Sequence, residues 1–358
     1  MKRRNTFMMG ILLSACWLMA GCSVIDDDLS DCGPAEEEVE LNYELRLVTN
    51  MITELQTQLN TELEVNLANV LKLHLANIFT DFAHDVDLSF YDTQKDSVRL
   101  HHDEHIMNAN QQSYTLYIPR QKYMHLAVAN IVDDPLVDLY YDQRCHTSQI
   151  LQTPSRLRSG SAQPDTIDSH TTGLFTARQL MEMIEGIDQS FNVKLFMANC
   201  AAVLVLDPRG HAYDNIKVYS TGFATGFNVC DSTYNYTATP PVVRTTHLQS
   251  DDCDEQAYCS VTFPSPESSQ TRTVIETVEP FIADPDENGL WEFRVYVPQD
   301  DGTITETILH IKETLRAGQL RIIKCWLGDH GEVKTLNPEV GTSVTLDWKD
   351  GLVIEGGY

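Results

Sequence analysis

Basic residues are scarce in this 358-residue chain. Only 25 Lys and Arg stand against 52 Asp and Glu, which gives a net charge of −27. Three of the basic residues and none of the acidic ones precede residue 22, so the remainder would carry 22 − 52 = −30. So acidic a chain repels phosphate backbones and anionic lipid headgroups. We therefore predict that it has no nucleic-acid partner.

Sequence signatures of catalysis are also missing. The chain has no Gly-x-Ser-x-Gly elbow, no Walker loop, no dinucleotide fingerprint and no Cys-x-x-Cys. The run from His101 to His105 has metal-binding residue types, but it is not His-Glu-x-x-His and lacks helical periodicity, so we interpret it as a solvated polar loop. We predict no enzyme, no cofactor and no metal, although abundant carboxylates leave a chance glycosidase-type pair open.

Long apolar runs are confined to the N-terminus. Residues 2–4 are basic, residues 7–20 are mostly apolar, and Ala20-Gly21-Cys22 follows. This order is typical of a secretory signal, and its ending resembles the bacterial lipobox. We predict a signal peptide over 1–21, lipidation of Cys22 with acyl chains such as palmitate, and an acidic tether over 22–38. Cleavage before Cys16 and an ordinary cleaved signal are the alternatives.

The other cysteines suit an exported protein. Seven follow Cys22, so at most three disulfides form: Cys32, Cys145, Cys200, Cys230, Cys253, Cys259 and Cys325. Connectivity cannot be deduced from spacing. Candidate pairs are Cys253 with Cys259, which are close in a polar loop, and Cys32 with Cys145. Cys200 lies in an apolar run and is interpreted as a small buried hydrophobe.

The spacing of apolar residues changes twice in the first half of the chain. Residues 39–47 alternate apolar and polar side chains, which predicts a half-buried strand. Residues 51–80 place leucines four apart, which predicts an amphipathic helix, capped at Thr53 and broken near Asn66. We interpret it as a helix laid on a sheet, with a partner-binding helix as the alternative. Further strands are expected at 86–91, 114–118 and 124–131, a loop at 153–172, and a short helix at 176–184.

The second half reads as short strands separated by turns. Strands are expected at 193–206, 216–219, 260–263, 291–297, 303–311, 319–326 and 343–348, with a hairpin at Asp301-Gly302. Cleavage after residue 21 leaves 358 − 21 = 337 residues, enough for two domains at about 150 residues each. We predict a mainly all-β protein with N-terminal (39–190) and C-terminal (191–358) β-sandwich domains, and one helix inserted in the first.

Several stretches together resemble a known family. Residues 22–34 run from the lipobox cysteine through Asp27-Asp28-Leu29-Ser30 to Cys32 and Pro34, and they resemble the start of mature FimB-type fimbrial subunits of Bacteroidales. Residues 87–92, 123–130 and 341–348 are similar to strands of that family. The resemblance implies two transthyretin-like domains and an outer-membrane, surface-exposed lipoprotein. It further implies an anchor or accessory subunit that binds a fimbrial stalk subunit by strand exchange.

The resemblance also implies that stalk subunits of such fimbriae lose their first strand to proteolysis, whereas an anchor keeps it. Arg46 is the only basic residue between Cys22 and Lys72, so a trypsin-like protease would need it exposed. We hypothesise that a mid-strand position protects it. Asp-Ser/Thr-x sites at Ser97, Thr166 and Ser232 are similar to O-glycosylation sites of Bacteroidales.

A second function stays open on the same fold. A surface adhesin or glycan-binding lipoprotein would need exposed aromatic side chains, for which Trp326 and Trp348 are candidates. Both lie in strand patterns that also suit a core. A hydrolase is the least favoured interpretation, because no catalytic constellation is visible.

Overall fold

The computed structural model describes most of the chain beyond residue 37, with gaps. The described ranges are 38–47, 51–80, 83–94, 97–106, 113–130, 137–140, 144–152, 166–183, 189–237, 240–267 and 289–345. The signal, Cys22, Cys32, Trp348 and the tether up to residue 37 therefore lie outside the described residues.

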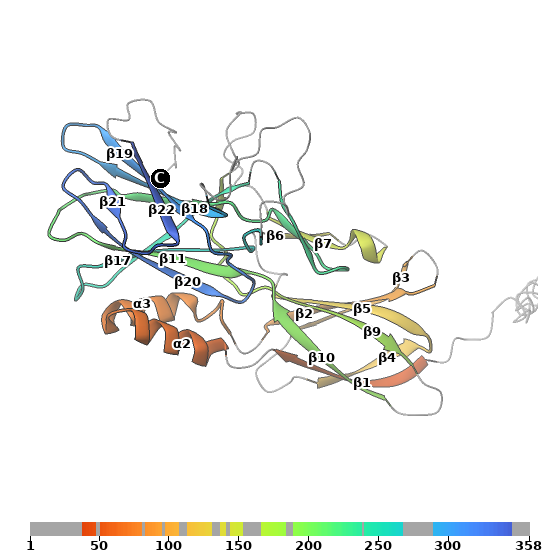
Figure 1. The fold of residues 1–358 in the computed structure, drawn as a ribbon. Coiled ribbons are helices and arrows are strands. Elements are labelled where there is room, and N and C mark those ends of the chain that lie inside the picture. The colour runs from red at the N-terminus through yellow and green to blue at the C-terminus, as the bar shows by residue number, and fades with distance from the viewer. Residues whose placement is uncertain are drawn as a thin grey trace, which may run out of the picture.

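The elements of the first part are two helices, one 3-10 turn and ten strands (Figure 1). They are β1 (Glu38–Leu47), α2 (Met51–Glu62), α3 (Val65–Leu75), β2 (Asp85–Asp92), β3 (Arg99–Ile106), β4 (Ser113–Pro119), β5 (Lys122–Ala129), β6 (Val137–Tyr140), η1 (Cys145–Thr147), β7 (Gln149–Gln152), β8 (Thr166–Asp168), β9 (Phe175–Glu182) and β10 (Gln189–Met197).

Only strands follow in the described second part. They are β11 (Cys200–Asp207), β12 (Lys217–Thr221), β13 (Gly226–Asn228), β14 (Thr233–Asn235), β15 (Val242–Arg244), β16 (Thr246–Gln249), β17 (Gln256–Thr262), β18 (Trp291–Pro298), β19 (Ile304–Ile311), β20 (Leu320–Leu327), β21 (Val333–Lys334) and β22 (Val340–Thr345). The predicted mainly all-β class is confirmed.

The first sandwich is one folded seven-stranded sheet, in the order β3-β2-β5-β9-β10-β1-β4. β10 pairs with β9 only at Phe196 and Met197, so the sheet bends there into layers of four and three strands. Alternating apolar side chains of both layers meet between them, including Leu41, Leu88 and Val193.

The second sandwich packs a five-stranded sheet on a six-stranded one. Their orders are β16-β17-β11-β20-β21 and β22-β19-β18-β12-β15-β8. Trp291, Phe293, Val295 and Val297 of β18 point into this core, as their alternation predicts. The hairpin between β18 and β19 is also confirmed, with Gly302 at a positive φ of 82° that favours glycine.

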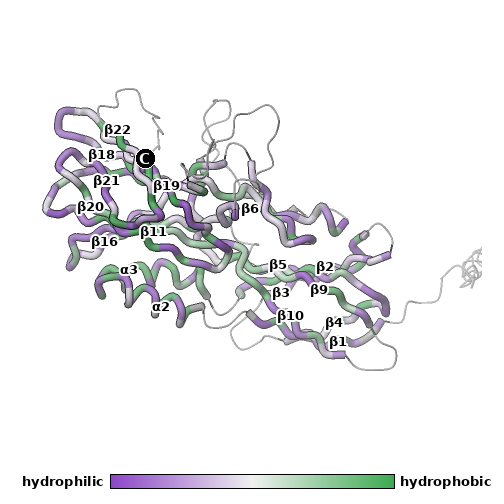
Figure 2. The backbone as a smooth tube through the Cα atoms, viewed as in Figure 1, coloured by the Kyte–Doolittle hydropathy of each residue, from purple (hydrophilic) through white to green (hydrophobic). Residues whose placement is uncertain are grey.

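The helices cover the outer face of the five-stranded sheet, which belongs to the second sandwich (Figure 1). They were expected as one helix of the first domain, so their location is a correction. Figure 2 shows hydrophobic and hydrophilic residues alternating around both. The predicted break near Asn66 is confirmed and falls at Leu63–Glu64. α2 begins at Met51, so Thr53 lies inside the helix and does not cap it.

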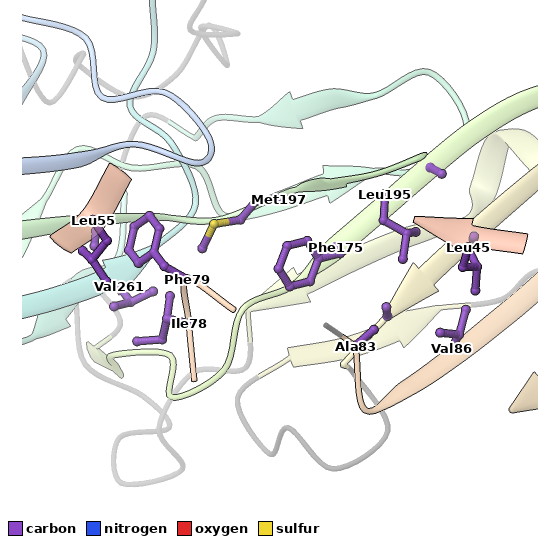
Figure 3. Packing of buried hydrophobic residues seen from close by; sticks show 14 of the residues in the cluster. Leu45, Leu55, Ile78, Phe79, Ala83, Val86, Phe175, Leu195, Met197 and Val261 are labelled. Carbon is purple, nitrogen blue, oxygen red and sulfur yellow. The ribbon is translucent and has the colours of Figure 1, made fainter. Parts of the chain in front are cut away.

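Helix packing joins the first sandwich and the outer face of the five-stranded sheet in one continuous core, while the interior of the second sandwich forms a separate cluster. Figure 3 shows buried side chains following one another from Leu55 and Phe79 near Val261 to Phe175, and on to Leu45 in the first sandwich. A four-stranded sheet, β14-β13-β7-β6, adds a second connection, because β6 and β7 come from the first half of the chain and β13 and β14 from the second. The two halves are therefore interlocked.

Several local expectations fail. Strand β8 lies within the loop expected over 153–172. Residues 176–184 were expected as a helix, yet β9 is a strand that pairs with β5 along its whole length, so tertiary pairing overrides its helix-favouring composition. Residues 193–206 were expected as one strand, but buried Asn199 divides β10 from β11. Its side chain accepts a hydrogen bond from the Leu174 amide and donates one to the Thr172 carbonyl.

The change of sheet comes between β10 and β11. The division expected at 190/191 falls inside β10, which pairs in parallel with β1. β8 and the helices, although early in the chain, complete the second sandwich. The domain limits therefore stay a prediction. The chain passes from the first sandwich to the second at Ala198–Asn199, between the end of β10 and the start of β11.

Candidate functional site: the seat of the first strand

The first strand occupies the centre of the three-stranded layer. β1 pairs in parallel with β10, from Leu41 opposite Gln189 to Leu47 opposite Leu195. It also pairs antiparallel with β4, from Glu38 opposite Pro119 to Glu44 opposite Ser113. The strand predicted over 39–47 is confirmed. Its backbone pairs on both sides from Leu41 to Glu44, with β4 alone before that stretch and with β10 alone after it.

The inward face of β1 is fully buried. Leu41, Tyr43 and Leu45 have between 0 and 2 % of their surface exposed. Burial of each such side chain contributes about 1.5–3 kcal/mol. Their sum is comparable to the whole stability of an ordinary domain, about 5–15 kcal/mol. β1 is therefore an integral part of the sandwich core.

A buried polar chain ties β1 to the opposite layer. The Tyr43 hydroxyl lies 2.5 Å from Nε2 of His125 on β5, and His125 Nδ1 lies 3.1 Å from the Ser89 carbonyl on β2. Burial lowers the pKa of His125 to about 3, so its ring is neutral. Nδ1 then donates to the Ser89 carbonyl and Nε2 accepts from Tyr43. Sequence patterns gave no signal for this contact, because the three residues are far apart in the chain.

Arg46 is the penultimate residue of β1, not a mid-strand residue. Its side chain is 58 % exposed and forms an ion pair with Glu44, Nη2 to Oε1 2.8 Å, which contributes little at a surface. Its backbone pairs with Lys194 of β10, while the ladder with β4 ends at Glu44. Any protection of the Arg46–Leu47 bond therefore comes from pairing on one side, not from side-chain burial.

The candidate disulfides are corrected. Cys145 bonds with Cys230, a partner 85 residues away, and not with Cys32. The bond joins η1 to the turn between β13 and β14. These two segments are far apart in the sequence and meet only in the folded chain. Cys253 and Cys259 are both free thiols, because Cys259 is buried within β17 while Cys253 is half-buried in the preceding loop. Burial also holds the pKa of Cys200 far above its ordinary value, as expected for an inert buried thiol.

The candidate glycosylation positions differ in accessibility. Ser232 is exposed in the turn between β13 and β14, at a positive φ of 58°. Ser97 is half-buried and its carbonyl accepts a hydrogen bond from the Cys145 amide. Thr166 is half-buried at the start of β8. Modification at all three stays a prediction, and Ser232 is the most accessible.

The structure also bears on Trp326, a candidate glycan-binding residue, and on the histidine-rich run 101–105. Trp326 is partly exposed, but the Arg209 guanidinium lies over its ring, 4.2 Å from the centroid, so its face is already occupied. The run from His101 to His105 forms strand β3 rather than a loop. No helix in the part of the chain that the structure describes is long and apolar enough to span a membrane.

Comparison with solved structures places this architecture among known folds. A candidate adhesin from Bacteroides ovatus aligns over 88 % of this chain and 97 % of its own, at 10 % identity and a TM-score of 0.50. The chain shares its fold. The mainly all-β class is consistent with this shared fold.

Two other solved structures align less closely. One is a candidate polysaccharide-binding protein from Bacteroides thetaiotaomicron, with 10 % identity, TM-score 0.49 and coverage of 84 % of this chain and 99 % of that one. The other is the fimbrial anchor protein Mfa2 from Porphyromonas gingivalis, with 10 % identity, TM-score 0.42 and coverage of 87 % and 99 %. No protein-family model matches the chain, and no curated protein matches its sequence.

Proposed function

We propose that this protein is a lipid-anchored outer-membrane subunit that anchors a surface fimbrium and keeps its first strand. The observation that carries the proposal is the burial of β1 between β10 and β4, with Leu41, Tyr43 and Leu45 in the core. An anchor transmits pulling force from the fibre to the membrane, so the strand that leads to the lipid must stay in its sheet.

The sequence ahead of β1 suits this role. Fifteen residues, 23–37, separate Cys22 from Glu38, a distance of sixteen Cα–Cα steps since 38 − 22 = 16, and they are rich in Asp and Glu. Fully extended, such a segment reaches at most about 55 Å. The lipid on Cys22 binds the membrane, and the tether holds the sandwiches within that reach of it. The acidic surface limits adsorption to anionic headgroups.

A stalk subunit is the proposed partner. Subunits of such fibres associate when a strand of one adds to the sheet of another. The fold shared with a candidate adhesin supports a role at the cell surface. The role is structural and involves no catalysis.

Mass spectrometry of the mature protein, purified from its own outer membrane, tests the proposal. We expect an acylated Cys22 followed by an intact chain through Leu47, and copurification with a fimbrial stalk. A mature N-terminus at Leu47 would show that the protease reaches Arg46 and that the subunit polymerises or caps the fibre. An unlipidated chain cleaved before Cys22 would remove the tether.

A surface adhesin that works without a fibre is the second candidate. Its support is the description of the Bacteroides ovatus protein of the same fold as an adhesin. Copurification separates the two functions: a lipidated chain that never associates with a stalk but retains host cells or glycans would favour the adhesin.

A further inference from the structure

The edge strand β3 carries an unusual set of side chains for a sheet edge. Among the strands that the structure describes, β3 pairs only with β2, from Asp85 opposite Ile106 to Tyr91 opposite Arg99. Its histidine-rich run alternates, so His102 and Glu104 share one face while His101, Asp103 and His105 share the other. The first face also bears Asp87 of β2, which lies directly opposite Glu104 in the ladder.

These three residues converge on one point. Ligand atoms of Asp87, His102 and Glu104 all lie within 4.8 Å of one another. His102 Nε2 is 2.7 Å from Asp87 Oδ2 and 3.8 Å from Glu104 Oε1. Asp87 is buried, with 5 % of its surface exposed, while Glu104 reaches in from the solvent side. One ligand is thus held rigidly, and the cluster stays open to water.

The hydrogen on His102 Nε2 cannot bond to the carboxylates of Asp87 and Glu104 at the same time. His102 Nε2 carries at most one hydrogen, so it donates to one of the two carboxylates at a time. A divalent cation accepts electron pairs from the imidazole and from both carboxylates together. It also offsets the repulsion between two carboxylates at short range, one of which is buried.

The ligand types favour zinc over calcium and magnesium. Calcium and magnesium take oxygen ligands almost exclusively, whereas zinc accepts imidazole and carboxylate in the same site. Zinc with three protein ligands and one water is four-coordinate, with ligand atoms about 3.3 Å apart. The separations of His102 Nε2 from Asp87 Oδ2, 2.7 Å, and from Glu104 Oε1, 3.8 Å, lie on either side of this value.

We propose that Asp87, His102 and Glu104 form a zinc site that clamps the edge strand β3 to β2. Ligands on two strands make the ion a cross-strand fastener. An unfastened edge strand is a sheet's weakest pairing and a template for unwanted association. The clamp therefore stabilises the first sandwich at its open side, on the layer opposite β1.

The site can be tested by calorimetry. The full mature chain is prepared without a histidine tag and titrated with zinc chloride. We expect one zinc per chain and a rise in the melting temperature. His102→Gln keeps a polar side chain but loses the imidazole ligand. It should weaken binding by more than the roughly 10–100-fold that loss of a supporting residue outside the ligand set causes.

Glu104→Gln provides an independent variant, because its side chain is 64 % exposed and its change leaves the core intact. It should also weaken zinc binding strongly. Two control variants change donors far from β3: His247→Ala on β16 and Cys253→Ser, whose half-buried thiol lies 3.5 Å from Glu64 Oε2. Both should bind as the unaltered chain does. Absence of zinc uptake by the unaltered chain, or equal uptake by the Glu104→Gln chain, would overturn the proposal.

Discussion

Truncation of Leu71 in α3 should destabilise the second sandwich, although Leu71 belongs to the first half of the sequence. Leu71 is 0 % exposed, and α3 contacts β16 and β17 of the five-stranded sheet. Leu71→Ala removes three carbons, about 2.4 kcal/mol of transfer free energy at 0.8 per group. The cavity left behind raises the loss to about 3 kcal/mol.

Tryptophan fluorescence isolates the effect. After removal of the signal, the tryptophans are Trp291, Trp326 and Trp348, all in the second half of the chain. Unfolding monitored by their emission should therefore shift in the Leu71→Ala chain. A loss of about 3 kcal/mol corresponds to a melting temperature lower by about 6–12 °C for a domain of 150–250 residues.

Leu73→Ala is the matched control in the same helix. Leu73 is 79 % exposed, so the same chemical change should alter stability by no more than about 0.5 kcal/mol. If Leu71→Ala leaves the tryptophan transition in place, or moves it no more than Leu73→Ala does, then the helices do not support the second sandwich. The packing described above would be refuted.

Three other predictions concern buried groups. Tyr43→Phe removes the hydroxyl that donates to His125 and should lower the free energy of unfolding by about 1–3 kcal/mol in urea titrations; an unchanged midpoint would contradict the contact. Replacing both Cys145 and Cys230 with Ser should cost about 4–5 kcal/mol by loop entropy for a separation of 85, and equal stability under oxidising conditions would refute this. Burial lowers the pKa of His125 to about 3 and of His170 to about 4, below the unfolded value of 6.5, so the unfolded chain binds more protons as pH falls. Stability from these rings is present above pH 6.5 and should fall by about 2 kcal/mol per histidine between pH 7 and 5; a flat profile would show that the rings are not buried neutral.

Local periodicity was enough to find most elements. Alternation over 39–47 and 291–297 predicted β1 and β18 and their inward faces, because side chains in a strand point alternately to opposite sides. The four-residue leucine spacing predicted the helices for the equivalent reason. The acidic composition and the lipobox-like N-terminus likewise come from the sequence alone, and they carry the surface-lipoprotein part of the proposed function.

Only the tertiary structure decided which of these elements meet. An apolar helix face does not specify its sheet, so the position of α2 and α3 on the second sandwich was missed. β9 has helix-favouring residues, yet two neighbouring strands supply the pairing that its own sequence does not specify. Cys230 as partner of Cys145, and His125 as partner of Tyr43, depend on contacts across about eighty residues. Sequence patterns report on neighbours along the chain, whereas free energy in this fold comes largely from side chains that the chain brings together across long separations.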